Sequence, residues 1–224
     1  MSELILALDV PAPNQALLIA QKLYPDITWC KVGLELFIAG GPSILTDLHT
    51  LGYHIFLDLK FYDIPHTVAR AVTQACALNV ELLTVHCQGG RKMLQAAKEA
   101  AGDSVQLLGV TALTSFAPNE MPGISKEPKD FAKDLAILAY DVGLTGIVCA
   151  ATDVAEIKKI APSLKCLCPG IRPKNTATQD QARIATPYAA VQAGADWLVV
   201  GRPILEAQDP KAMVKSILAE MQSE

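Results

Sequence analysis

The sequence predicts an α/β fold, a (β/α)8 TIM barrel that forms a single domain over residues 1–224. Short apolar runs alternate along the chain with segments of helical periodicity, as strands and crossover helices do in such barrels. The chain is 51% hydrophobic with a mean hydropathy of +0.28, which implies a large buried core. No linker or low-complexity tract divides the 224 residues, a length typical of one barrel.

Eight runs have the continuous apolar character of parallel strands that are buried on both faces. About 28 residues for each strand and its helix are sufficient for one barrel. The alternative fold, an open doubly wound sheet, usually carries a glycine-rich turn after its first strand, and this chain has PAPNQ there instead. Helical periodicity is clearest at 14–23, 66–78, 92–102 and 128–143. The expected strands are ILALDV (5–10), ITWCKV (27–32), HIFLDLK (54–60), LLTVHC (82–87), VQLLGVTAL (105–113), GIVCA (146–150), CLCPGI (166–171) and WLVVGR (197–202).

Charge and composition exclude several classes of protein. Nineteen Lys and Arg against 23 Asp and Glu give a net charge of −4, without the basic excess that nucleic acid binding requires. No apolar run approaches the length of a membrane span, and the amino terminus carries an acidic residue, so we expect a soluble, cytoplasmic protein. Six scattered cysteines without a C-x-x-C pair are expected to be reduced and buried: Cys30, Cys76, Cys87, Cys149, Cys166 and Cys168.

Charged residues end the first three apolar runs, where barrels of this class carry their chemistry. Asp9 ends the first run, Lys31 the second, and Asp58 and Lys60 the third, with Asp63 in the loop beyond. Side chains alternate along a strand, so Asp58 and Lys60 point the same way and should face the barrel mouth. Buried charges are tolerated when they are paired, and several charges on adjacent strands predict a functional cluster.

Polar groups at later strand ends give weaker signals. His86 ends the fourth run and is as consistent with a structural residue as with a substrate contact. Thr114 and Ser115 follow the fifth run and could form hydrogen bonds.

The loops after the seventh and eighth strands are the recurrent phosphate site of this fold. Gly201 permits close backbone approach, while Arg172 and Arg202 supply charged donors suited to a phosphate dianion. The intervening polar stretch at 174–183 has few apolar anchors, and we expect it to close over a ligand.

Longer stretches around these residues resemble the orotidine 5′-monophosphate decarboxylase family. The resemblance runs from LALDV at 6–10 to the last helix, and its most specific motif is D-x-K-x-x-D-I-P. It implies a barrel that removes CO2 from orotidine 5′-monophosphate to form uridine 5′-monophosphate in de novo pyrimidine biosynthesis, without a metal or organic cofactor. The matching stretches are KVGLELF (31–37), DLKFYDIPHTVARA (58–71), GIRP (170–173), DQAR (180–183) and GADWLVVGRPI (194–204).

The same resemblance implies roles for individual residues. Lys60 would be the proton donor, with Lys31, Asp58 and Asp63 completing an alternating charged array. The enzyme would be a homodimer with shared active sites, because Asp63 and Ile64 would reach into the neighbouring subunit. Substrate contacts would come from Asp9 and Lys31 at the ribose, from Thr114 and Ser115 at the pyrimidine, from Arg172, Gln181, Gly201 and Arg202 at the phosphate end, and from Thr67.

Three rival functions are less consistent with the residues. A metal-dependent decarboxylase or aldolase of the same superfamily, acting on a keto-sugar phosphate, would carry a Glu ligand where this chain has Lys31, and a cation there would repel Mg²⁺. A catalytically silent phosphate-binding barrel would have no use for the buried charges. A triosephosphate-type isomerase would need a Glu base at a strand end, and none of the eight runs ends in one.

Overall fold

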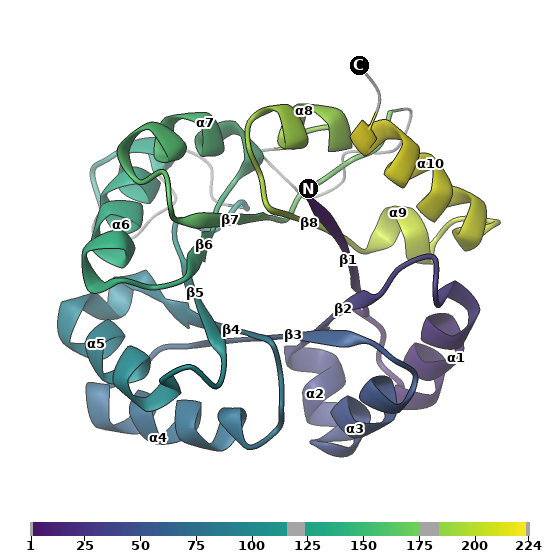
Figure 1. The fold of residues 1–224 in the computed structure, drawn as a ribbon, viewed down its shortest axis with the longest axis horizontal. Helices are drawn as coiled ribbons and strands as arrows, with labels where there is room; N and C mark the ends of the chain where they lie inside the picture. Colours follow the sequence, from purple (N-terminus) through teal and green to yellow (C-terminus); the bar gives the residue numbers. More distant parts are fainter. Residues whose placement is uncertain (1, 116–123, 175–183, 223–224) are drawn as a thin grey trace.

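The computed structural model describes residues 2–115, 124–174 and 184–222. Its eight strands pair in parallel and in sequence order, and β8 closes onto β1 (Figure 1). Helices surround the barrel on the outside, so the predicted (β/α)8 fold is confirmed. The strands are β1 (Glu3–Ala7), β2 (Trp29–Gly33), β3 (His54–Phe61), β4 (Leu82–His86), β5 (Gln106–Val110), β6 (Gly146–Val148), β7 (Lys165–Cys168) and β8 (Trp197–Val200).

The four segments with clear helical periodicity all form helices: α1 (Pro13–Leu23), α4 (Pro65–Cys76), α5 (Gly90–Ala101) and α6 (Pro128–Val142). Three of them begin with proline, whose fixed φ suits the first turn and whose missing N–H has no partner to lose there. The structure adds helices that the periodicity did not single out: α2 (Leu34–Gly40), α3 (Ser43–Thr50), α7 (Ala151–Ile160), α8 (Pro187–Gln192), α9 (Arg202–Leu205), α10 (Pro210–Gln222) and the 3-10 turn η1 (Cys87–Gly89).

Six of the strands end one to three residues before their predicted apolar runs do, and the ends of β1 and β8 bear on the site. β1 ends at Ala7, although the Leu8 N–H still donates to the Lys31 carbonyl at 3.1 Å, which keeps Asp9 at the mouth. β8 ends at Val200, and Arg202 is not a strand residue but the first residue of α9. The proline that follows it favours the first turn of a helix over a continued strand.

The core has two main parts, one inside the barrel and one between the barrel and its helices. Sequence neighbours on a strand divide between them: Leu82 faces the interior, whereas Leu83 packs toward the helices. This division explains why the strands read as continuous apolar runs. The interior cluster consists of Ile5, Ala7, Phe56, Leu82, Leu108, Leu167, Trp197 and Val199.

All six cysteines are free thiols, and five of them are buried, while Cys76 is partly exposed. Burial raises the pKa of the Cys87 thiol to about 12 and also raises the pKa of the Cys76 thiol. Because the thiolate is the reactive form, these side chains behave as small hydrophobic residues at neutral pH.

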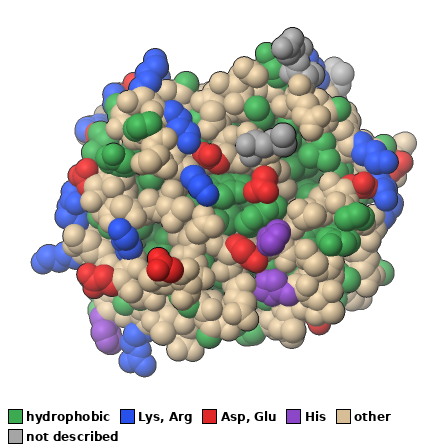
Figure 2. Space-filling model, in the orientation of Figure 1, with side chains coloured by type: hydrophobic (Ala, Val, Ile, Leu, Met, Phe, Trp, Pro, Cys, Tyr) green, Lys and Arg blue, Asp and Glu red, His purple; other side chains and the backbone are tan. Residues whose placement is uncertain are grey.

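Acidic and basic side chains are interspersed around a central hydrophobic patch on the face shown in Figure 2, in line with the small net charge of −4. Among residues 2–115, 124–174 and 184–222, no helix combines the length and the apolar character needed to cross a bilayer.

Candidate active site

The predicted charged cluster forms at the carboxyl ends of β1, β2 and β3. Lys31 Nζ lies 2.7 Å from Asp9 Oδ1 and 3.8 Å from Asp58 Oδ2. Lys60 Nζ lies 2.7 Å from the same Asp58 oxygen, so Asp58 and Lys60 do point the same way. Negative and positive groups therefore alternate in the order Asp9, Lys31, Asp58 and Lys60.

The end of β2 leaves room for this arrangement. A Cβ atom on Gly33 would lie 3.0 Å from Lys31 Nζ and 3.2 Å from Asp9 Oδ1. Both contacts are tighter than side chains normally accept. A glycine at this position therefore allows the Asp9–Lys31 ion pair to lie across the strand end.

Asp58 is a buried member of the cluster, with only 8% of its surface exposed. A carboxylate so far from water is stable only if ion pairs and hydrogen bonds replace its hydration. Its Oδ2 faces both ammonium groups, and its Oδ1 accepts a hydrogen bond from the Thr84 hydroxyl at 3.0 Å. The charges are thus fixed in place before any ligand binds, which is the condition for electrostatic preorganisation.

Lys60 occupies an irregular part of β3. Leu57 pairs with Leu83 of β4, but the next pair is Phe61 with Val85, so β3 carries extra residues in a bulge. The φ angle of Lys60 is 50°, a left-handed conformation that costs a residue with a side chain roughly 1–2 kcal/mol. Strain of this kind clusters at functional sites, where surrounding contacts hold it.

The cluster forms one wall of a pocket of about 470 Å³ at the carboxyl ends of the strands. Its floor is apolar and is formed by Phe56, Val110, Val148, Leu167 and Val199. A cavity of this size, with an apolar floor and a few fixed charges, suits a small-molecule ligand. The predicted site residues that line it are Asp9, Lys31, Asp58, Lys60, Thr114, Arg172, Gly201 and Arg202.

Other predicted residues do not line this pocket. Asp63, Ile64 and Thr67 are exposed beyond β3, and Asp63 Oδ1 accepts a hydrogen bond from the Ile64 N–H at 2.6 Å. Ser115 is also exposed and outside the lining, whereas its neighbour Thr114 lines the pocket. Gln181 lies outside the described residues, as does most of the stretch expected to close over a ligand.

The two arginines of the predicted phosphate end lie on the same pocket. Arg172 is buried, and its Nη1 donates to the Ile171 carbonyl at 3.0 Å. Gly201 precedes α9 and passes so close to β1 that a Cβ atom there would lie 3.2 Å from the Ala7 Cβ. A glycine therefore avoids a tight contact with β1 at this point and also permits ligand approach.

Sequence reasoning missed Thr84, which lies inside an apolar run and is completely buried on β4. It also left the role of His86 open. The structure places His86 against the Tyr62 ring, with 5.7 Å between ring centroids, close enough to the cluster for its pKa to be affected. The only available signal was their spacing: Leu82, Thr84 and His86 alternate and so share the inward face of β4.

His86 should make stability depend on pH. Burial, and secondarily the Lys60 charge, lowers the pKa of His86 below its ordinary 6.5, so the unfolded chain binds a proton more readily than the folded one. The free energy of folding that neutral His86 contributes is fully present above pH 6.5, the ordinary pKa that applies in the unfolded chain. It is lost as the pH falls through the lower pKa of the folded protein. The Tm of the wild type should therefore drop more between pH 7 and pH 5 than that of His86→Gln. Equal drops in thermal unfolding would contradict this assignment.

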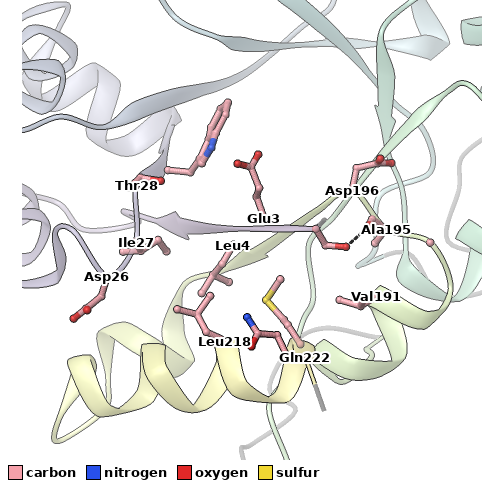
Figure 3. A pocket seen from close by; sticks show the side chains of 14 residues that line it. Glu3, Leu4, Asp26, Ile27, Thr28, Val191, Ala195, Asp196, Leu218 and Gln222 are labelled. Atoms are coloured by element: carbon pink, nitrogen blue, oxygen red, sulfur yellow. Dashed lines mark hydrogen bonds between the residues drawn. The ribbon is translucent and has the colours of Figure 1, made fainter. Parts of the chain in front are cut away.

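A second cavity, of about 510 Å³, lies at the opposite end of the barrel (Figure 3). Its acidic side chains already have protein partners: Glu3 accepts from Trp197 Nε1 at 3.2 Å, and Asp196 accepts from Lys158 Nζ at 2.8 Å. Asp26 pairs with Lys211 at 3.2 Å. The first contact joins β1 to β8, and the other two join loops at this end of the barrel to α7 and α10. We therefore assign this cavity a structural role and place the chemistry at the carboxyl ends.

Comparisons with known proteins agree with this geometry. Residues 2–217 match the model of the "Orotidine 5'-phosphate decarboxylase / HUMPS family". The chain is 45% identical to an orotidine 5′-phosphate decarboxylase of Nitratidesulfovibrio vulgaris strain DP4 over 230 residues, covering 99% of this chain and 98% of the relative. It is 42% identical to the enzyme of that name from Lawsonia intracellularis, covering 99% of this chain and 100% of the relative.

A solved structure gives the same result. The crystal structure of orotidine 5′-phosphate decarboxylase from Lactobacillus acidophilus superposes with a TM-score of 0.87 at 34% identity, and the match covers 100% of both chains. The chain therefore belongs to the orotidine 5′-phosphate decarboxylase / HUMPS family.

Proposed function

We propose that this protein is a carboxy-lyase that converts orotidine 5′-monophosphate to uridine 5′-monophosphate in pyrimidine biosynthesis, without a metal or organic cofactor. The observation that carries the proposal is the alternating array of Asp9, Lys31, Asp58 and Lys60 on the wall of the pocket. Relatives at 41–45% identity over nearly the whole chain bear the name of this enzyme.

The reaction explains why the array is needed. Loss of CO2 from C6 of the pyrimidine leaves a carbanion whose lone pair lies in the ring plane, where the ring π-system cannot delocalise it. Stabilisation must therefore come from the protein. The Lys60 ammonium, held 2.7 Å from Asp58, is a fixed positive charge that stabilises the developing anion and then donates its proton to C6.

The remaining pocket residues bind and orient the nucleotide. In this proposal Asp9 and Lys31 contact the ribose, Thr114 with Ser115 the pyrimidine, and Arg172, Gly201 and Arg202, together with Gln181, the phosphate. The positions of Arg172 and Arg202 on the pocket support the phosphate end. Energy from this remote contact is available to assemble the site around the reacting carbon.

Arg202→Ala tests the phosphate assignment. A charge-assisted hydrogen bond contributes about 1.5–3 kcal/mol, so kcat/KM for the nucleotide should fall by about 10- to 150-fold, with a strong rise in KM. The nucleoside, which has no phosphate to contact, should be turned over equally by both proteins. An equal loss on the two substrates would show that Arg202 binds another part of the ligand.

We further propose a homodimer in which Asp63 and Ile64 complete the partner's site. Asp63 does not line the pocket of its own chain, although D-x-K-x-x-D places it three residues after Lys60. The same loop exposes apolar side chains to water, with Tyr62 59% and Ile64 65% exposed. Such side chains are typical of a protein interface.

The assay that tests the function follows the loss of orotidine 5′-monophosphate absorbance with purified, EDTA-treated protein. Full turnover is expected, because Lys31 already pairs with the carboxylates of Asp9 and Asp58 that a divalent ion would use. Turnover that disappears with EDTA and returns with Mg²⁺ would contradict the cofactor-free reaction. Activity on a keto-sugar phosphate alone would assign the metal-dependent sibling function.

A further inference from the structure

Thr84 lies directly behind the charged array and has no assigned role. It is on β4, inside the barrel, and none of its surface is exposed to solvent. It does not line the pocket, so it cannot act through direct contact with a ligand there. A buried hydroxyl is retained in such a place only when it has hydrogen-bond partners.

Thr84 forms hydrogen bonds with both Asp58 and Lys60 of β3. The backbone N–H of Lys60 lies 2.9 Å from Thr84 Oγ1, and Thr84 Oγ1 lies 3.0 Å from Asp58 Oδ1. The Lys60 N–H can only donate, so the hydroxyl accepts there and its own proton goes to the Asp58 carboxylate. The direction of both bonds is therefore fixed.

Each bond constrains a different part of the array. The bond to Oδ1 fixes the rotation of the Asp58 carboxylate, which turns Oδ2 toward Lys60 Nζ at 2.7 Å and Lys31 Nζ at 3.8 Å. The bond from the Lys60 N–H holds the bulge in which that residue has a φ of 50°. One side chain thus fixes the backbone of Lys60 and the partner of its ammonium group.

We propose that Thr84 is a positioning residue, which sets the location of the Lys60 ammonium through Asp58 and through the β3 bulge. This inference rests on the proposed decarboxylation. Misplacing a reacting group by about 1 Å can cost about 100-fold in rate. The effect of losing the hydroxyl should therefore appear in kcat, while KM, which depends on ribose and phosphate contacts, should change little.

Thr84→Val and Thr84→Ser test the proposal. Valine keeps the shape and removes the hydroxyl, so kcat should fall by about 100-fold with KM within about twofold of the wild type. Serine keeps the hydroxyl and should retain kcat within about threefold. If valine does not yield folded protein, Thr84→Cys, whose S–H is a weak donor, carries the same expectation as valine.

Thr111→Val is the matched control. Thr111 is also buried at a strand end, and its hydroxyl donates to the Val148 carbonyl at 2.8 Å without touching the array. Both valine variants should lose some thermal stability, but only Thr84→Val should lose kcat. Equal kcat losses in the two variants, or normal kcat in Thr84→Val, would overturn the positioning role.

A crystal structure of Thr84→Val separates this inference from the proposed function. Lys60 Nζ is expected to leave hydrogen-bond distance of Asp58 Oδ2, whatever reaction the protein catalyses. An unchanged ion pair would overturn the proposal about Thr84. A wild-type protein that does not decarboxylate orotidine 5′-monophosphate would instead overturn the proposed function.

Discussion

Lys60→Ala should lower the turnover of orotidine 5′-monophosphate by more than about 10⁴-fold, because one group supplies both electrostatic stabilisation and the proton. The fold should survive the change. The Lys60 side chain is 33% exposed, and Asp58 keeps its Thr84 hydrogen bond and Lys31 as a neighbour at 3.8 Å. Turnover and thermal unfolding, measured on the same preparation, check both statements.

Lys211→Ala is the control for this variant. Lys211 forms an ion pair with Asp26 at 3.2 Å, at the opposite end of the barrel from the charged array. An ion pair of this kind contributes about 0–1 kcal/mol, so turnover should stay near the wild-type value. Near-normal turnover in Lys60→Ala would mean that Lys60 is only a structural partner of Asp58.

Mixed dimers of a Lys60→Ala subunit and an Asp63→Ala subunit should recover activity that neither homodimer has. If Lys60 acts in its own subunit and Asp63 in the partner's site, Lys60→Ala and Asp63→Ala homodimers are each severely impaired. In a mixed dimer one site carries both changes, while the other site carries neither. Random exchange makes about half of the dimers mixed, each with one intact site, so activity should return to about a quarter of the wild-type value.

The exchange is performed in mild denaturant, followed by dilution and assay. Mass spectrometry establishes that mixed dimers have formed. If mixed dimers have formed but activity stays at the level of the two homodimers, Asp63 acts in the site of its own chain. A protein that remains monomeric at assay concentrations would rule out the shared site altogether.

The charged array could be predicted because it depends on simple geometry. Alternation along β3 places Asp58 and Lys60 on one face, and parallel pairing brings the ends of β1 and β2 beside them. Arg202 lines the pocket as predicted, but the sequence placed it in a strand, since the apolar run hid the helix start that Pro203 indicates.

Other features of the site left no local signal in the sequence. The bulge at Lys60 has no glycine or asparagine to mark its left-handed φ of 50°. Thr84 looks like an ordinary strand residue until the array that it contacts is known. Asp63 is exposed because of the conformation of the loop after β3. Tertiary contacts determine that conformation, and the periodicity of the sequence does not reveal it.

The central claim is that a positive charge at position 60 carries the chemistry, and restoring that charge chemically tests it. Lys60→Cys should be inactive. Treatment with 2-bromoethylamine converts the introduced thiol to a side chain that ends in an ammonium group, whereas iodoacetamide leaves a neutral one. Five native cysteines are buried, and wild-type protein treated in parallel controls for any labelling of the partly exposed Cys76.

Aminoethylation should raise the turnover of Lys60→Cys by at least about 100-fold, and carbamidomethylation should leave it unchanged. Equal recovery with both reagents would contradict the account, as would no recovery after mass spectrometry has confirmed complete aminoethylation at position 60.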